Sequence, residues 1–222
     1  MGSTSMPAGN AAAMRDHWVW RPDWTPERTC LYWYLTFRRD EIVEAVGEQV
    51  LETVRRTSWL DAVPPEWAHV TVADVGFTDE LRSSDVERVT AAVAEAVAGE
   101  ERLPLALGPV LTFSSAVVLS AGPLNRLRAV KRGVRRATSA VLGPRHTDVH
   151  RNLFWPHLSL GYVNEPVEAP VAAALLDDLP PVSAGIDVDA LILAAVTRRD
   201  GQYQWEVQAQ VELVGGVAHA RR

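Results

Sequence analysis

Two short segments of the chain each place a histidine and a hydroxyl residue two positions apart. WAHVTVADVGF contains His69 and Thr71, and FWPHLSLGYVN contains His157 and Ser159. Both segments are rich in β-branched and aromatic residues, which predicts that both are strands. Because side chains two apart lie on the same face of a strand, each segment presents an imidazole beside a hydroxyl.

The repetition of this pattern in the two halves of the chain has a chemical use. A single strand histidine is usually a hydrogen-bonded structural residue. Two histidines can divide the work at one phosphorus centre, because one acts as general base while the other acts as general acid. Two hydroxyls can bind the non-bridging oxygens whose negative charge increases in the transition state. The pattern therefore favours phosphoryl chemistry at a site that both halves share.

Helices and strands alternate around these segments in the first half of the chain. Residues 29–37 predict a strand, and apolar residues at helical spacing predict a helix over 39–56. Ser84 is a candidate cap for a helix over 85–98, and Gly99 follows the end of that helix.

The second half adds further strands. The apolar runs LPLALG and VLTFSSAVVLSAG predict paired strands, and a buried stripe then predicts a helix that ends at Gly143. A loop over 144–156 leads to the second histidine segment. A short helix near 170–178 precedes strands over 186–197 and 203–214, which an RRDGQ turn joins. Because these late strands follow each other directly, we expect an α+β fold rather than a doubly wound sheet.

The composition is that of a globular protein, with 47% hydrophobic and 23% charged residues in 222. We expect no membrane span, because no apolar run reaches about 18 residues. The start of the chain also lacks the pattern of a secretory signal. The single cysteine, Cys30, cannot form an internal disulfide, which favours a reducing cytoplasm. The net charge of −6 argues against coating long nucleic acid but not against binding a small nucleotide or an RNA end.

The two motifs carry a family resemblance. HVTV at 69–72 and HLSL at 157–160 resemble the paired HxTx-type motifs of the two-histidine (2H) phosphoesterase superfamily, which includes the bacterial 2′-5′ RNA ligase family and cyclic phosphodiesterases. The wider stretch PHLSLGY is similar to that family's second motif. The resemblance covers about residues 29–214, with helices and strands in a compatible order.

This resemblance implies a bilobal α+β fold with pseudo-two-fold symmetry, in which antiparallel sheets flanked by helices line a central cleft. It makes His69 and His157 the catalytic residues and Thr71 and Ser159 the phosphate-binding residues. Family members act without a metal on 2′,3′-cyclic phosphates, 2′-5′ linkages or related nucleotide phosphodiesters. We therefore expect no cofactor, and a nucleotide or RNA end as the substrate.

The same comparison divides the chain into three parts. We expect a flexible tail and Trp-rich arm over 1–28, one bilobal phosphoesterase domain over 29–214 and a C-terminal tail over 215–222. We expect a cytoplasmic monomer with no membrane contact and no obligate protein partner. In the reaction, one neutral histidine would accept a proton from water and the other would donate one to the leaving ribose oxygen. We prefer His69 as the acid and His157 as the base, although the sequence does not distinguish the two.

Three further residues are candidate substrate contacts. Regular alternation places Tyr162 on the face opposite His157, in the core, unless Gly161 marks a bulge that turns it. His150 and Arg151 lie in the loop before the second motif, where an ordinary solvated loop is the alternative.

A zinc site is a second interpretation of that loop. His146 and His150 have an H-x₃-H spacing, which would place two ligands on one face of a helix. The segment follows Gly143-Pro144 and contains no obvious third ligand, so we expect no metal.

Two other features have a structural and a functional interpretation. The helix over 124–142 carries five arginines and Lys131, which suits either a solvated face, the interpretation we favour, or steering of RNA phosphates. The stretch HWVWRPDW, residues 17–24, suits either an aromatic arm packed across the body, which we favour, or stacking on nucleobases.

The alternatives to a phosphodiesterase keep the same residues. Ligases that adenylate themselves need a nucleophilic lysine, and the only lysine, Lys131, lies in no recognisable nucleotide motif. ATP-dependent ligation is therefore disfavoured. A reversible ATP-independent 2′-5′ RNA ligase, a cyclic-oligonucleotide phosphodiesterase and a non-catalytic nucleotide- or RNA-binding module are the alternatives that the sequence leaves.

Overall fold

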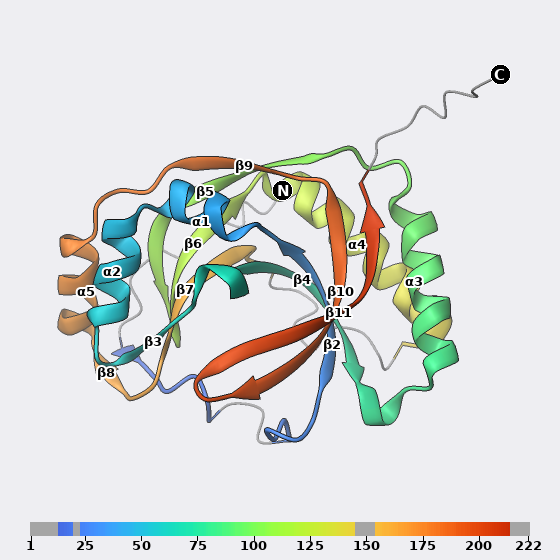
Figure 1. Ribbon diagram of the computed structural model, residues 1–222, viewed down its shortest axis with the longest axis horizontal. Helices are drawn as coiled ribbons and strands as arrows, with labels where there is room; N and C mark the ends of the chain where they lie inside the picture. The colour runs from blue at the N-terminus through green and yellow to red at the C-terminus, as the bar shows by residue number, and fades with distance from the viewer. Residues whose placement is uncertain (1–12, 20–22, 145–153, 214–222) are drawn as a thin grey trace, which may run out of the picture.

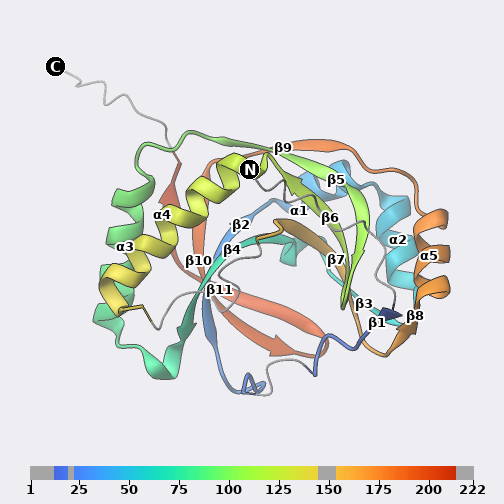
Figure 2. The same ribbon diagram turned by 180° about the vertical axis from the view of Figure 1, so that it is seen from behind.

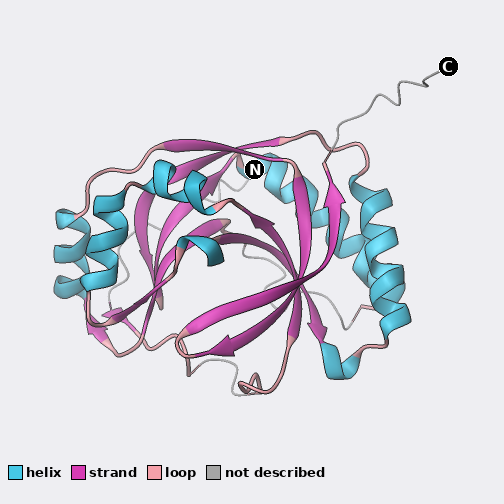
Figure 3. Cartoon of the chain, in the orientation of Figure 1, coloured by secondary structure: helices cyan, strands magenta, loops and turns pink. Residues whose placement is uncertain are grey.

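The computed structural model describes residues 13–19, 23–144 and 154–213 (Figure 1). In this part of the chain, helices pack on the outside of a curved antiparallel sheet (Figure 3). The helices are α1 (Arg39–Val46), α2 (Glu48–Arg56), α3 (Ser83–Val97), α4 (Leu124–Leu142) and α5 (Ala169–Asp178). The strands are β1 (Ala13–Met14), β2 (Cys30–Thr36), β3 (Leu60–Ala62), β4 (His69–Phe77), β5 (Leu103–Phe113), β6 (Ala116–Gly122), β7 (His157–Val163), β8 (Val167–Glu168), β9 (Ala184–Val188), β10 (Ala190–Arg199) and β11 (Gln202–Glu212).

The main sheet of the described residues has two equivalent halves. Its strand order is β11-β10-β2-β4-β7-β6-β5-β9, and β3 adds to β7. One half contains the unit β2–α1–α2–β4 and the other contains β6–α4–β7, each a pair of neighbouring strands joined through helices. Each half is extended by a further strand, since β5 pairs with β6 and β10 pairs with β2. The bilobal α+β fold with pseudo-two-fold symmetry is thus confirmed.

Helices cover the sheet in two groups. In both views, α3 and α4 lie together at one end of the molecule, whereas α1, α2 and α5 lie at the other (Figures 1 and 2). A continuous apolar cluster joins these helices to the strands, with Trp33, Leu119, Leu158 and Leu193 fully buried in it. Burial of this aliphatic surface is the main force that holds helices and sheet together.

The opposite face of the sheet carries a separate aromatic cluster. It includes Tyr32, Tyr34, Tyr162 and Tyr203, together with Trp24 from the segment that precedes β2. The two clusters show that the central strands are buried on both faces. One face is aliphatic and packs on helices, and the other combines aromatic rings with polar groups.

Two helix predictions are corrected. The helix expected over 39–56 is broken at Gly47, whose φ of 85° is easily adopted only by glycine, so α1 and α2 are separate helices. The helix expected over 85–98 begins two residues earlier, at Ser83, and Arg82 rather than Ser84 takes the N-cap position. The carboxylate of Asp85 accepts hydrogen bonds from the backbone N–H and the guanidinium of Arg82, so the polar partner at this end is an acid in the first turn rather than a capping serine.

Two strand boundaries are also corrected. The sequence predicts one strand in each of the runs LPLALG and VLTFSSAVVLSAG. Instead, β5 includes the whole first run, continues through the Gly108-Pro109 bond, and ends at Phe113 in the second run. The hairpin turn lies at residues 114–115, inside the second run. The strand expected over 186–197 is divided at Asp189 into β9 and β10, which pair with different neighbours.

No helix in the described ranges is long and apolar enough to cross a membrane.

Strand β7 contains a bulge next to Gly161. Val118 pairs with Ser159 and Val117 pairs with Gly161, so Leu160 is an extra residue in β7. A Cβ atom on Gly161 would lie 3.1 Å from Cγ1 of Val54 and 3.4 Å from Cβ of Leu60. The absence of a side chain here lets β7 approach the helix layer closely.

We therefore predict that Gly161→Val lowers the free energy of unfolding by about 1–3 kcal/mol, because the added methyl groups overpack this contact. Urea unfolding followed by circular dichroism measures the change. Gly99→Ala is the matched control, since a Cβ there meets nothing within 4 Å, and it should stay within about 0.5 kcal/mol of the parent. Equal stability of the two variants would contradict the close packing at Gly161.

Candidate active site

The two histidine strands are neighbours at the centre of the sheet. The ladder between β4 and β7 consists of one antiparallel pair, Val70 opposite Leu158. Antiparallel register around that pair brings His69 toward Ser159 and Thr71 toward His157. A local two-fold axis at the pair therefore exchanges the two motifs.

Both imidazoles are held in the same way. Nδ1 of His69 lies 2.9 Å from the carbonyl oxygen of Trp67, and Nδ1 of His157 lies 2.6 Å from that of Trp155. Because a carbonyl oxygen can only accept, each Nδ1 carries a proton and donates it. Nε2 is then the nitrogen that exchanges protons, and a neutral ring can act as a base while a charged ring can act as an acid there.

Each histidine is bound by the backbone of the residue two positions before it, in the stretches WAH and WPH. These carbonyl groups fix the tautomer of both rings. Because every residue carries a backbone carbonyl, no residue type in the sequence marks these positioning groups.

One cavity of about 470 Å³ brings the predicted residues together. Its lining includes His69, Thr71, His157 and Ser159. All four tyrosines of the chain line the same cavity, as do Asp74 and Lys131. The volume is within the usual range of a small-molecule site, and mixed aromatic and polar walls suit a nucleotide. A groove of about 630 Å³ between α3 and β11 is larger, but none of the four motif residues lines it.

The bulge in β7 decides where Tyr162 points. The extra residue, Leu160, belongs to the aliphatic cluster on the helix side, whereas Tyr162 belongs to the aromatic cluster and lines the cavity. The alternation that would have placed Tyr162 opposite His157 is interrupted at Gly161, so the bulge interpretation is the correct one. Burial raises the pKa of Tyr162, and the Ser159 hydroxyl opposes this shift.

Burial controls the protonation of both motif histidines. It lowers the pKa of His69 to about 4, with a smaller contribution in the same direction from the positive charge of His157. The pKa of His157 is also lowered by burial, and its hydrogen bond to the Trp155 carbonyl opposes this shift. In addition, the His69 ring stacks on Tyr34 with centroids 4.1 Å apart, and Phe113 contacts the His157 ring edge-on at 4.9 Å.

The basic helix does not present all its cations to solvent. Lys131 of α4 is 8% exposed and lines the cavity, and its Nζ lies 4.4 Å from the centroid of the Phe154 ring. The five arginines of α4 are half-buried or exposed. The interpretation of the whole basic run as a solvated face is therefore wrong for Lys131, the residue that the apolar stripe of α4 directs inward.

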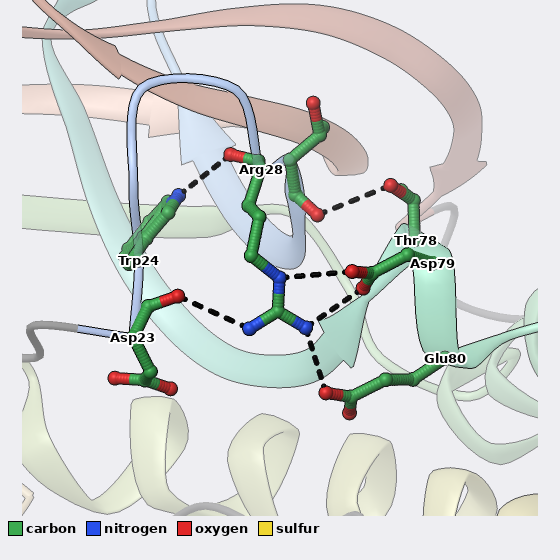
Figure 4. Close-up of polar contacts among 7 residues, drawn as sticks. Asp23, Trp24, Arg28, Thr78, Asp79 and Glu80 are labelled. Carbon is green, nitrogen blue, oxygen red and sulfur yellow. Dashed lines mark hydrogen bonds and ion pairs between the residues drawn. The ribbon is translucent and has the colours of Figure 1, made fainter.

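The aromatic arm before β2 packs across the body, as the sequence analysis favoured. Trp24 is buried, and its indole N–H donates to the carbonyl of Arg28. The Arg28 guanidinium in turn binds Asp79 and Glu80 beyond the end of β4 and the carbonyl of Asp23 (Figure 4). This network fixes the arm beside the sheet.

One further imidazole of the cavity was not identified from the sequence. His17 of the arm lines the cavity, and its ring lies 4.4 Å from that of Tyr162. It had no motif around it, and long-range packing alone brings it to the site.

Two predicted substrate contacts, His150 and Arg151, lie outside the described residues, as does His146 of the H-x₃-H pair. Among residues 13–19, 23–144 and 154–213, no group of three or more metal-binding side chains is present.

The family model of the 2′-5′ RNA ligase superfamily matches residues 42–200, most of the chain. The chain belongs to the 2′-5′ RNA ligase superfamily. This assignment agrees with the paired motifs and with their meeting in one cavity. No match was found among curated protein sequences.

Solved structures of superfamily proteins share the fold. TT0787 of Thermus thermophilus is 19% identical and aligns with a TM-score of 0.64 over 84% of this chain and 98% of its own. LigT of E. coli, in a complex with 3′-AMP, is 16% identical, with a TM-score of 0.65 over 84% of this chain and 99% of its own. At such identities the likeness establishes the fold of this superfamily member and leaves its substrate to be argued from the site.

The buried histidines make the stability of the fold depend on pH. In the unfolded chain, both histidines become protonated as the pH falls below their ordinary pKa of 6.5. In the native state, His69 becomes protonated only near pH 4 and His17 only near pH 3, so the unfolded state binds more protons between these values. Stability is therefore complete above pH 6.5 and falls as the pH falls from there. Each histidine contributes a slope of up to about 1.4 kcal/mol per pH unit.

We predict a measurable loss of unfolding free energy between pH 7 and pH 5 in urea titrations. His69→Gln should reduce the slope over this interval, because one proton-linked group is removed. A slope that is unchanged in the variant would show that carboxylates, not this histidine, dominate the pH dependence.

Proposed function

We propose that the protein is a metal-independent phosphodiesterase that acts on 2′,3′-cyclic phosphates or 2′-5′-linked nucleotide or RNA ends. The observation that carries the proposal is the two-fold arrangement of His69 and His157, each with Nδ1 bound to a carbonyl and each beside a hydroxyl residue in one cavity. This arrangement leaves two Nε2 atoms for proton transfer and two hydroxyls for one phosphate. Structures of LigT with 3′-AMP and with phosphate support a nucleotide phosphate as the ligand class.

In the proposed reaction, His69 is the base and His157 is the acid. This reverses the preference taken from the sequence, because burial lowers the pKa of His69 to about 4 and so keeps this ring neutral, as a general base must be. An anionic phosphate in the cavity would favour a charged imidazole on His157. The stacked Tyr34 ring and the edge-on Phe113 ring keep both imidazoles in their rotamers.

The atoms balance in one displacement. The oxygen of water forms a bond to phosphorus, while the bond from phosphorus to one ribose oxygen breaks. Nε2 of His69 takes the proton of the water, and Nε2 of His157 donates a proton to the leaving oxygen. Thr71 and Ser159 bind the non-bridging oxygens, and the ammonium group of Lys131 contributes positive charge to the cavity wall.

Reversal of this displacement is the second candidate. If a ribose hydroxyl replaces water and a cyclic phosphate is the donor, the same residues form a 2′-5′ linkage without ATP. Lys131, the only lysine, is buried against Phe154 and does not resemble an exposed nucleophile for adenylation. We prefer hydrolysis because none of the observed features of the cavity requires a second nucleotide.

We predict hydrolysis of 2′,3′-cyclic mononucleotides, 2′-5′ dinucleotides or cyclic dinucleotides in a substrate panel followed by chromatography. His69→Ala and His157→Ala should each lower kcat/KM by about 10²–10⁴-fold, because each removes one proton-transfer group. Activity should persist in EDTA. Thr53→Ala, on the exposed face of α2, is the control and should keep the parent rate.

Two results would refute this mechanism: near-parental rates in either histidine variant, or loss of activity in EDTA. Nucleotide binding in calorimetry without turnover of any panel member would instead favour a binding module.

We further predict a bell-shaped dependence of kcat/KM on pH with its maximum below neutrality. The acid limb follows protonation of His69 near pH 4, and the alkaline limb follows loss of the proton from His157, whose pKa is below 6.5. Initial rates from about pH 3.5 to about pH 9 define both limbs. A profile that is flat through this range would exclude the two-histidine mechanism.

A further inference from the structure

We propose that the N-terminal arm forms part of the substrate site, where His17 positions the hydroxyl groups of Tyr203 and Ser115 to bind the nucleoside attached to the scissile phosphate. The proposal rests on the phosphodiesterase function proposed above. It adds a ligand-binding role for residues outside the two motifs. His17 and Tyr203 also lie outside residues 42–200, the range that the family model matches.

The arm is a fixed wall of the cavity. Ala13 and Met14 of β1 pair with Glu168 and Val167 of β8. The next residues continue this attachment, since the N–H of His17 donates to the carbonyl of Val163 at 2.7 Å.

Trp18 attaches the arm at a second point. Its indole N–H donates to the Asp61 carboxylate at 2.7 Å, and the Arg198 guanidinium donates to its carbonyl oxygen at 2.8 Å. The His17 backbone is therefore held by bonds to β7 and β8 on one side and to Asp61 and Arg198 on the other.

The His17 side chain bridges two hydroxyl groups. Nδ1 lies 3.0 Å from Oγ of Ser115, and Nε2 lies 2.8 Å from the hydroxyl of Tyr203. Both of these residues line the cavity with His17. Burial, together with the positive charges of Arg198, His157 and Arg15, lowers the pKa of His17 to about 3.

A neutral imidazole has one donor nitrogen and one acceptor nitrogen. His17 therefore donates to one of the two hydroxyls and accepts from the other. Because His17 stays neutral while the catalytic pair titrates, this arrangement is constant over the working pH range.

The position of His17 places these groups beside the phosphate-binding end of the cavity. Its ring packs on Tyr162, which lines the cavity together with Ser159. A group bound by Tyr203 and Ser115 would thus lie in the same cavity as a phosphate bound by Ser159.

The chemistry of the wall suits a nucleoside more than a second phosphate. The hydroxyl groups of Tyr203 and Ser115, which the neutral His17 ring holds in place, can bind sugar hydroxyls without a net charge. The Trp24 ring stacks on Tyr32 with centroids 5.6 Å apart and contacts Tyr203 at 5.5 Å. All three rings line the cavity, where they offer a flat apolar surface to a base. The arm supplies Trp24 as well as His17, so both kinds of contact depend on it.

The test combines binding and kinetics on the full-length protein. His17→Phe keeps a ring against Tyr162 but removes both nitrogens, and Tyr203→Phe removes one hydroxyl. For each variant we expect the KM for 2′,3′-cyclic AMP and the calorimetric Kd for 2′-AMP to rise about tenfold, with kcat within about threefold of the parent. Val19→Ala, an arm variant whose side chain is 66% exposed and does not line the cavity, should leave all three values within about twofold.

Several outcomes would overturn the proposal. These are unchanged KM and Kd in both variants, an equal effect of Val19→Ala, or a loss of kcat with a shifted pH profile, which would place His17 in proton transfer. If His17→Phe does not fold, Tyr203→Phe and Ser115→Ala decide, since each deletes a single hydroxyl. Absence of turnover in the parent protein would refute the phosphodiesterase function alone, because 2′-AMP affinity still tests the His17 wall. A parent protein that does not bind 2′-AMP would overturn the proposal itself.

Discussion

The backbone pairing of Val70 with Leu158 is the constraint on which the site depends. It is the one point at which β4 and β7 are joined in register, and the two lobes of the sheet meet there. A slip of one residue in either strand would turn its imidazole and hydroxyl toward the helices. Both valine and leucine belong to the aliphatic core, so the packing that stabilises the fold also holds this register.

Burial has a second consequence at the same place. Strands that are covered on both faces leave little water around His69 and His157, which lowers the pKa of both rings. The carbonyl groups of Trp67 and Trp155 then fix which nitrogen carries the proton. The position of the two imidazoles in the sheet, their low exposure to water and their tautomer are thus linked. Each follows from placing a histidine and a hydroxyl residue in an otherwise apolar strand.

The two-fold symmetry of the motifs is broken around them. On the Ser159 side, a bulge at Leu160 turns Tyr162 into the cavity, and the arm adds His17 against it. Around the first motif, in β4, Tyr34 and Trp205 pack against the His69 ring instead. An asymmetric lining is what a site needs in order to bind a phosphodiester whose two ester oxygens carry different groups.

The sequence by itself determined the two motifs, most of the elements and the family. Period-two patterning placed His69 beside Thr71 and His157 beside Ser159 on strand faces, because that alternation is a local property of an extended chain. Helix breaks, caps and strand ends were less predictable: Gly47 and Asp189 act through backbone geometry and pairing partners that a local pattern does not contain. Only the tertiary structure decided that Tyr162 faces the cavity and that His17 joins it. Each of these depends on contacts between residues far apart in the chain, and no local periodicity encodes such contacts.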